Sequence, residues 1–357
     1  MKGNPAEGLK QLVEKLRTQP QVGVSLEGTV FSSVCRGARL GCFYLKSSSS
    51  GSGKTRTSIF DACHIAYPER WSEEKNTFVK EKEKEPQKVL FIVTEMDKEE
   101  LQTIMLAYLS GVDEAHIITG SYAAEELERV NYAVSIIDRY SEYFIIEEIS
   151  EPNLTNVEAT IKKYALMDEV KYVFFDYIHS TASMINQFAR SNIREDVVLM
   201  LMANQLKQLA KDYNVFIFSA TQVNMGAMSN DDGEFKNETN IRSSKAIVDK
   251  ADVGYVMSRI SDKFWNSVMG DLRKAAREGL IDATKLEDKN RPTHVLDIYK
   301  MRQGRYKNVR IWTRIHLGTG YRKDLFMTTS ENQPIPGTIE LFLSPGEDEI
   351  TDWKDKI

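Results

Sequence analysis

The sequence predicts an α/β fold in which a mostly parallel central sheet has helices on both faces. Short apolar runs typical of buried strands alternate with longer stretches of helical periodicity, and this alternation indicates parallel strands joined by helices. The runs of strand character are 42–46, 89–94, 172–175, 215–218, 253–257, 295–299 and 309–313. The last two flank the polar sequence RQGRYK, so they predict a C-terminal β-hairpin.

Apolar residues at helical spacing predict the helices between these strands. The clearest amphipathic segments are 6–17, 98–108 and 194–212, and a further helix follows residue 53. Residues 261–292 predict a separate, charged helical insertion, with Phe264, Val268 and Leu272 on one face.

Two charged or proline-containing segments are expected to lie outside the sheet. The charge run 71–88 predicts a solvated helix end or loop. The segment after Gln333 has three prolines and an acidic end, so we expect it to be partly disordered. The predicted organisation is therefore a helix and linker at 1–27, one large domain at 28–330 that includes the insertion, and a tail at 331–357.

The composition is that of an ordinary soluble globular protein, with 41% hydrophobic and 28% charged residues. No apolar run is long enough to span a bilayer, and the N-terminal residues are too charged for a signal peptide. We therefore expect a cytoplasmic protein without membrane contact. The three cysteines show neither disulfide nor zinc-site spacing, and the net charge of −5 still permits a locally positive nucleic-acid channel.

Residues 48–55 (SSSGSGKT) follow the P-loop pattern G-x-x-x-x-G-K-[ST], except that Ser48 replaces the first glycine. Small residues let backbone N–H groups surround phosphate oxygens at a helix N-terminus. The alternative is a flexible Ser/Gly linker, but an apolar strand precedes the segment and an amphipathic helix follows it. The candidate nucleotide-binding residues are Ser50, Gly51, Ser52, Gly53, Lys54, Thr55 and Arg56. Of these, Lys54 is expected to reach the β- and γ-phosphates and Thr55 to bind Mg²⁺.

Two acidic residues at strand ends could complete an NTPase site. Asp176 ends the run KYVFFD, where a metal-supporting aspartate is expected, although a turn aspartate is the alternative. Glu95 directly follows the strand VLFIVT, so its carboxylate should emerge at the carboxyl edge of the sheet. There it could orient or deprotonate a water molecule, and an exposed helix-capping acid is the alternative.

Five segments between about residues 20 and 325 resemble, in order, the motifs of DnaB-like replicative DNA helicases. They are Thr94-Glu95-Met96 with DKEELQTIML, Phe175-Asp176-Tyr177-Ile178, QLKQLAKDYNVFIFSATQVN, Ile241-Arg242-Ser243-Ser244 followed by Ala251-Asp252, and Lys300-Met301-Arg302-Gln303-Gly304. The resemblance is to the C-terminal RecA-like motor domain, and it implies a RecA-like P-loop NTPase core.

The resemblance also implies the activity and the partners. It predicts an ATP hydrolase and DNA helicase of DNA replication that uses ATP and Mg²⁺ at the subunit interfaces of a homo-hexameric ring. Single-stranded DNA would pass through the centre, and primase or a helicase loader would be a partner. Fewer than fifty residues precede the P-loop, so we expect an isolated motor domain or a phage- or mobile-element-type relative without the N-terminal collar domain.

The catalytic roles come from the same resemblance, position by position. The implied catalytic residues are Lys54, Glu95, Gln222, Lys300 and Arg302, with Thr55 and Asp176 at the metal. Glu95 would activate water, and Gln222 would sense the γ-phosphate and couple it to DNA. Arg302 would act as an arginine finger on the ATP of the neighbouring subunit, with Lys300 beside it; a solvated cationic hairpin is the alternative.

The DNA contacts implied by the resemblance lie in two loops near 179–194 and 224–245. The candidates are Arg190, Arg194, Asn224, Arg242 and Lys245. Such contacts would be independent of DNA sequence and sensitive to salt. The second loop also carries acidic residues that repel a phosphate backbone.

Two other functions are compatible with the same motifs. One is a RecA- or KaiC-like ATPase that does not translocate, and the other is a nucleotide-dependent DNA-binding scaffold with poor turnover. The K-x-R-x-G element at 300–304 favours the helicase. A scaffold has no need of Glu95, Asp176 and Arg302 together.

Overall fold

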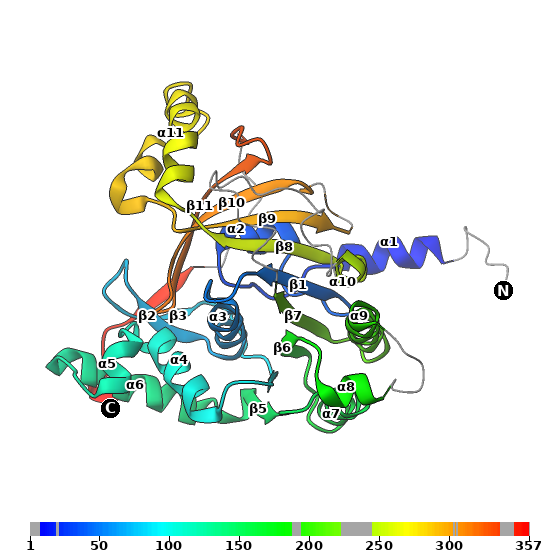
Figure 1. The fold of residues 1–357 in the computed structure, drawn as a ribbon. Helices are drawn as coiled ribbons and strands as arrows, with labels where there is room; N and C mark the ends of the chain where they lie inside the picture. Colours follow the sequence, from blue (N-terminus) through cyan, green and yellow to red (C-terminus); the bar gives the residue numbers. More distant parts are fainter. Residues whose placement is uncertain are drawn as a thin grey trace.

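The computed structural model describes residues 8–18, 21–187, 194–222, 245–302, 304, 306–335 and 346–356. Within them, nine strands form one sheet in the order β11-β10-β9-β8-β1-β7-β6-β4-β5 (Figure 1). The strands are β1 (Phe43–Ser48), β4 (Val89–Val93), β5 (Phe144–Glu148), β6 (Tyr172–Ile178), β7 (Phe216–Gln222), β8 (Val253–Arg259), β9 (His294–Met301), β10 (Val309–His316) and β11 (Tyr321–Thr329). From β8 to β5 the pairing is parallel, whereas β9, β10 and β11 pair antiparallel. This confirms the predicted mostly parallel sheet with a C-terminal hairpin.

Helices cover both faces of this sheet. The helices are α1 (Leu9–Thr18), α2 (Thr29–Cys35), α3 (Lys54–Ala66), α4 (Lys98–Ser110), α5 (Glu114–Thr119), α6 (Ala124–Arg139), α7 (Leu154–Met167), α8 (Ala182–Asn186), α9 (Glu195–Asp212), α10 (Lys245–Val248) and α11 (Asp262–Arg277). Short 3₁₀ turns lie at Ser141–Tyr143, Ala283–Leu286, Asp288–Asn290 and Trp353–Lys356. None of the helices in the described part of the chain is long and apolar enough to cross a membrane.

Successive strand residues point to opposite faces, and this alternation divides the core in two. Phe174 packs in the core under α3, α4 and α6, whereas Phe175 packs in the core under α7 and α9. Every residue of β1 is buried, as expected for a parallel strand covered on both faces. The carboxyl ends of the parallel strands therefore all open at one edge of the sheet, next to the N-terminus of α3 (Figure 1).

The prediction for the charge run 71–88 is wrong. Two strands, β2 (Glu69–Ser72) and β3 (Thr77–Glu81), form a hairpin, and β12 (Glu347–Ile350) pairs with β3 to make a second, three-stranded sheet. Trp71, Phe78 and Val79 are buried between the charged residues. Lys80 faces solvent, whereas Glu69 and Glu81 are buried with charged partners, Arg139 and Lys84. Because many of the charges are paired inside the fold, the segment has the composition of a loop although it forms strands.

The tail prediction is also wrong for residues 346–356. Beside β12, the indole of Trp353 is buried in an aromatic cluster with Trp71, Phe78 and Tyr132. A buried tryptophan of this kind gives enough apolar contact to fix a terminal segment. The C-terminal residues thus form a strap on the second sheet.

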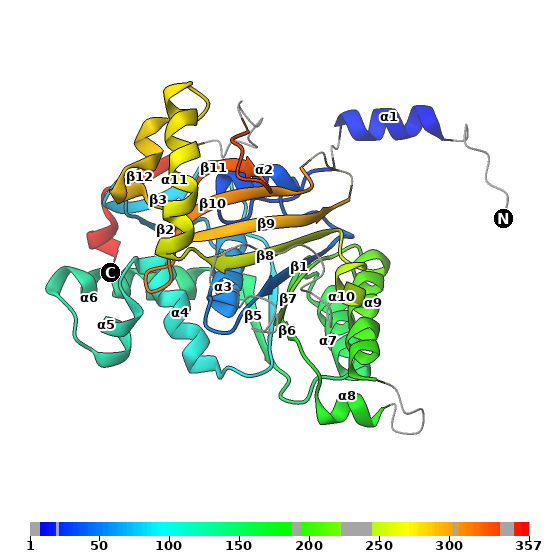
Figure 2. The ribbon, with the colours of Figure 1, turned by 45° about the horizontal axis from the view of Figure 1, so that its top comes forward.

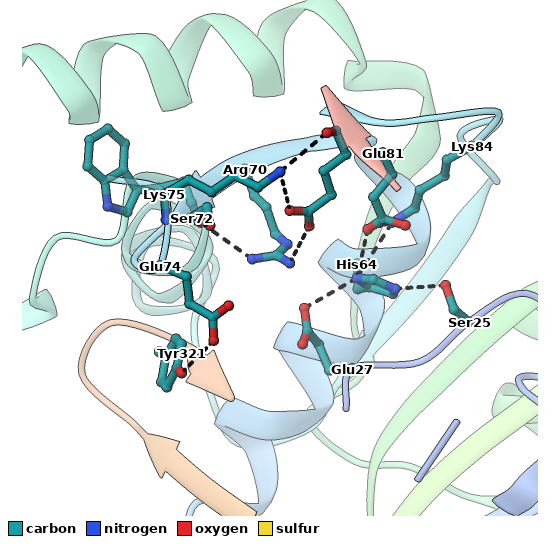
Figure 3. Close-up of polar contacts among 12 residues, drawn as sticks. Ser25, Glu27, His64, Arg70, Ser72, Glu74, Lys75, Glu81, Lys84 and Tyr321 are labelled. Carbon is teal, nitrogen blue, oxygen red and sulfur yellow. Dashed lines mark hydrogen bonds and ion pairs between the residues drawn. The ribbon is translucent and has the colours of Figure 1, made fainter. Parts of the chain in front are cut away.

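Ion pairs join this second sheet to the main domain (Figure 3). Within the second sheet, the Arg70 guanidinium on β2 donates to the Glu347 carboxylate on β12 over 3.0 Å, and this bond holds β12 in place. His64 on α3 lies between two carboxylates, with its Nδ1 3.2 Å from Glu27 and 3.4 Å from Glu81. Glu27, His64 and Glu81 are buried, and buried charges need partners to avoid a large desolvation cost.

The segment 261–292 is not a separate unit. The apolar face of α11, which includes Phe264, Val268 and Leu272, packs on Trp312 and Phe326 of the main sheet. The outer face is charged, so the segment is an attached layer at the hairpin side of the sheet (Figure 2).

Replacing Trp353 with alanine should release the strap. Removal of a buried tryptophan typically costs about 3–5 kcal/mol, and here the loss should appear as local unfolding of β12 and the last turn. We expect rapid proteolysis near the C-terminus together with a lower Tm. The exposed neighbour Asp355→Asn is the matched control, and equal protease resistance of the two variants would contradict the assignment.

Candidate functional site

The P-loop closes between the end of β1 and the start of α3. Gly51 and Gly53 have φ of 72° and 93°, in the left-handed region that glycine adopts most readily. A side chain at Gly53 would also meet Leu317, whose Cδ2 lies 2.5 Å from the position of a Cβ. Backbone conformation therefore favours glycine at both positions, and the close approach of Leu317 adds a limit of space at Gly53.

Serine hydroxyls stabilise the loop where the pattern lacks its first glycine. Ser48 is fully buried, and its hydroxyl forms a short hydrogen bond with that of Ser52. Ser52 in turn donates to the Ser49 carbonyl over 2.6 Å. The departure at Ser48 is thus compatible with a closed phosphate-binding loop.

Asp176 and Glu95 lie beside this loop. The register of β4 and β6 pairs Val93 with Asp176, so both acids reach the carboxyl edge, and the Thr94 hydroxyl donates to the Asp176 carbonyl over 2.9 Å. Asp176 is buried and its Oδ1 has no hydrogen bond. Glu95 is exposed, which leaves its carboxylate open to water.

Electrostatics couples these groups to Lys54. Partial burial lowers the pKa of the Lys54 ammonium, and the carboxylates of Asp176 and Glu95 oppose that change. Burial raises the pKa of Asp176, whereas a hydrogen bond from the Thr55 hydroxyl and the charges of Lys46 and Lys54 favour its ionised form. A cation and two acids are therefore held together at one end of the sheet.

The donor set fits Mg²⁺. An unpartnered, buried carboxylate oxygen of Asp176 lies next to the Thr55 hydroxyl, and hard oxygen ligands are those that Mg²⁺ prefers. Since Mg²⁺ keeps several waters and binds few protein groups, two such residues suffice.

Tyr177 belongs to this site, although the sequence analysis gave it no role. Its hydroxyl donates to Glu95 Oε1 over 3.0 Å, and the Lys54 ammonium lies 5.0 Å from the centre of its ring. Burial and the nearby Glu95 raise the pKa of Tyr177 to about 12, so it stays a donor. The signal available in the sequence was its position directly after Asp176.

Two further predicted residues lie at the same edge. Gln222 ends β7 and pairs in register with Ser48. Arg56, predicted as a nucleotide contact, forms a close ion pair with Glu114 on α5. The start of α5 also contacts the 317–320 loop, because Glu114 N donates to the Gly318 carbonyl over 2.9 Å.

Lys300 and Arg302 lie at the opposite end of the strands, away from the P-loop. Because β9 runs antiparallel to β8, Lys300 pairs with Gly254 near the start of β8. The Arg302 N–H donates to the Asp252 carbonyl over 2.7 Å, and its guanidinium is half-exposed, 3.7 Å from the Asp252 carboxylate. Lys300 Nζ donates to the Val248 carbonyl over 3.0 Å.

The length of β8 separates these two cations from the P-loop of the same chain. β8 begins beside Arg302 and ends beyond Met257, which pairs with Ser48. Arg302 lies beside Asp252, five residues before Met257, so at about 3.3 Å per residue the separation along the strand is roughly 17 Å. One chain therefore does not bring its own Arg302 to its own Lys54.

The predicted DNA contacts are described only in part. Arg194 occupies the N-cap position of α9, and its side chain forms an exposed ion pair with Asp196 over 2.7 Å. Lys245 begins α10, and its side chain lies outside the description. Arg190, Asn224 and Arg242 lie outside the described residues, so their roles stay predictions.

The comparison with known proteins matches this geometry. Residues 23–317 fit the model of the DnaB-like helicase C terminal domain. The chain belongs to this family. The resemblance found in the motifs to DnaB-like helicases is thus confirmed.

Individual relatives of this DnaB-like domain agree. The chain is 33% identical over 334 residues to the SPbeta prophage-derived uncharacterized protein YorI of Bacillus subtilis (strain 168), which covers 92% of this chain and 63% of that protein. The chain therefore spans less than two thirds of that relative's length. The prophage origin fits the expected phage type.

Two solved structures show the same fold at 15% identity. The first is an ATPase domain, with a TM-score of 0.66 and coverage of 91% of this chain and 100% of that chain. The second is a DnaB-like replicative helicase studied with primase, with a TM-score of 0.64 and coverage of 91% and 67%. These matches confirm the RecA-like fold of the domain.

His294 makes the stability of this domain depend on pH. It begins β9 at the P-loop edge, is 3% exposed, and its Nε2 has no hydrogen bond. Burial and the charge of Arg259 lower its pKa to about 4. A histidine with a depressed pKa contributes stability above about pH 6.5 that is lost as the pH falls toward 4, because the unfolded chain binds the proton more readily.

When the pH is lowered from 7 to 4, the free energy of unfolding of His294→Gln should therefore fall by about 3 kcal/mol less than that of the wild type. Denaturant unfolding at several pH values measures this difference. The exposed His316→Gln is the control. Parallel pH profiles for the wild type and His294→Gln would contradict the assignment.

Proposed function

We propose that this chain is the motor of a DnaB-like DNA helicase, a cytoplasmic ring that hydrolyses ATP between its subunits and moves along single-stranded DNA to unwind duplex during replication. One observation carries the proposal: the phosphate site and the Lys300–Arg302 pair lie at opposite edges of one sheet. A chain with two such half-sites needs a neighbour on each side to complete them. Repeating that contact generates a ring or a filament.

The chain's own residues supply most of the chemistry at the first half-site. Backbone N–H groups of the loop and the Lys54 ammonium bind the phosphates, and Thr55 and Asp176 hold Mg²⁺. When bound, Mg²⁺ neutralises charge between the β- and γ-phosphates. Glu95, exposed and oriented by Tyr177, positions and deprotonates the attacking water. Gln222 at the same edge is placed to sense the γ-phosphate.

The second half-site supplies the remaining cation. Arg302 is half-exposed, and its guanidinium lies 3.7 Å from the Asp252 carboxylate and donates to the Asp249 carbonyl over 3.3 Å. These contacts leave it at the surface, where it would contact the ATP of a neighbour. An arginine finger accelerates phosphoryl transfer by about 10³ to 10⁵ in NTPases. Lys300 adds a second positive charge to the same surface.

α1 supports assembly between copies. None of its residues is buried, and it extends away from the rest of the chain (Figure 2). Its apolar side chains Leu9, Leu12, Val13 and Leu16 are 39–65% exposed. Exposed apolar side chains in one stripe mark an interaction surface, and we assign it to the adjacent subunit of the ring.

DNA and partner proteins complete the proposal. Single-stranded DNA would contact Arg190, Arg194, Asn224, Arg242 and Lys245. Because four of these side chains are cationic, the affinity for DNA would fall as the salt concentration rises. One structural relative is a replicative helicase whose interactions with primase were studied. By analogy we propose primase or a helicase loader as a partner of this chain.

ATP hydrolysis with and without single-stranded DNA tests the motor. We expect DNA to stimulate turnover in the wild type, and Lys54→Ala and Arg302→Ala each to lower it by at least about 10³, because each removes a charge from the phosphates. Mixing the two variants should restore part of the activity, since a Lys54→Ala subunit still offers its Arg302 to an intact P-loop. The exposed Lys289→Ala is the control.

Other outcomes favour the alternative functions. Turnover that DNA does not stimulate, together with full activity of Arg302→Ala, would indicate a non-translocating ATPase. Nucleotide and DNA binding without turnover would indicate a scaffold.

A charged α1 should prevent assembly. The double substitution Leu12→Glu and Val13→Glu places carboxylates on the apolar stripe, so we expect a monomer by light scattering and turnover as low as that of Arg302→Ala. Lys10→Glu, on the same exposed helix, controls for added charge. An unchanged oligomer would show that α1 does not join the subunits.

A further inference from the structure

Lys46 is a buried lysine directly beneath the P-loop. It is the one charged residue of β1, and it is 0% exposed. Its ammonium donates to the Lys54 carbonyl over 3.1 Å, the Thr57 hydroxyl over 2.7 Å and the Ser58 hydroxyl over 3.0 Å. All three acceptors belong to the first turns of α3.

These bonds use the full donor capacity of the side chain, because an ammonium group has three N–H bonds. Lys46 is therefore unable to contact a phosphate itself. It donates instead to the backbone carbonyl of Lys54, the residue that begins α3 and is expected to reach the phosphates.

A buried carboxylate that acts electrostatically on Lys46 is also on α3. Asp61 lies one turn beyond Thr57, is fully buried, and accepts a hydrogen bond from Glu27 N over 3.0 Å, while its Oδ2 has none. Burial raises the pKa of Asp61 to about 6, and Lys46 opposes this. Burial lowers the pKa of Lys46 to about 7, and Asp61 and Asp176 oppose that change.

Stability alone does not account for this pair. Replacing a buried ion pair with apolar residues of similar size is often neutral or stabilising, whereas removing one partner is costly. The Lys46 ammonium instead connects the strand before the P-loop with the helix after it.

We propose that Lys46 is a positioning residue of the nucleotide site, which fixes the first turn of α3 so that the Lys54 ammonium and the Thr55 hydroxyl face the phosphates. The inference rests on the proposed ATPase function and adds a residue to that site. Without the Lys46 ammonium, the first turn of α3 loses its three bonds to β1. The affinity for the phosphate groups then falls although Lys54 is present.

Three variants separate positioning from folding: Lys46→Met, Asp61→Asn and the combination of the two. The measurements are the Tm, equilibrium binding of fluorescent ADP, and steady-state ATP hydrolysis. Asp61→Asn is the matched control, because it removes the carboxylate charge that acts on Lys46 and leaves the three bonds from Lys46 to α3 in place. We expect it to bind ADP within about twofold of wild type.

Lys46→Met should lower the Tm because the buried Asp61 loses one of the two cations, Lys46 and Arg322, that favour its charged form. The combined variant should recover most of that Tm, yet bind ADP and turn over ATP with kcat/KM at least about tenfold below wild type. Recovery of both Tm and nucleotide affinity in the combined variant would overturn the proposal and leave Lys46 a structural residue. A tenfold loss of affinity in Asp61→Asn would also overturn it, by making the Asp61 charge decisive.

Failure of the proposed function gives a different result. A wild-type chain that binds ADP but does not hydrolyse ATP would contradict the motor, and the binding measurements on the three variants would still decide the role of Lys46.

Discussion

The parallel pairing of β1 with β7 and β8 at the centre of the sheet is the constraint on which the rest of the structure depends. Since β1 is buried along its whole length, its register is fixed on both sides. Its carboxyl end therefore places Ser48 and the P-loop at the same end of the sheet as Asp176 and Gln222. At its amino end, Phe43 N donates to the Asp252 carboxylate over 2.8 Å, and Asp252 in turn contacts Arg302. Both half-sites of the proposed motor are thus attached to the two ends of one strand.

Buried charge is concentrated around the helix that follows this strand. Lys46 and Asp61 lie on one side of α3, and His64 lies between Glu27 and Glu81 at its far end. Each group has a partner on a different element, so the bonds join β1, β3 and the segment before α2 to a single helix. An arrangement of this kind costs desolvation and offers little stability in return. What it provides is a fixed position for α3, whose first residue is Lys54.

The sequence was sufficient for the features that are local. The glycines and Lys54 of the P-loop, the strand-end positions of Glu95 and Asp176, and the hairpin after Arg302 all follow from short segments with a clear physical pattern. The features that failed depend on distant residues. Trp71 and Phe78 look like isolated apolar residues in a charge run until Trp353 covers them. In the same way, the role of a lysine in the strand 42–46 depends on its bonds to the helix that follows, and the pKa of the histidine at 294 depends on its burial and on the charge of Arg259.

The position of Asp252 has a consequence for an assembled ring. The same carboxylate accepts from the backbone of β1 and from Lys207 of α9, and it lies next to the guanidinium of Arg302. A guanidinium drawn toward a neighbour's triphosphate would leave Asp252 with one cation fewer. That change would alter the electrostatic environment at the amino end of β1, the strand that leads to the subunit's own P-loop. In the proposed ring, the loading of one site would thus be physically connected to the strand that leads to the next.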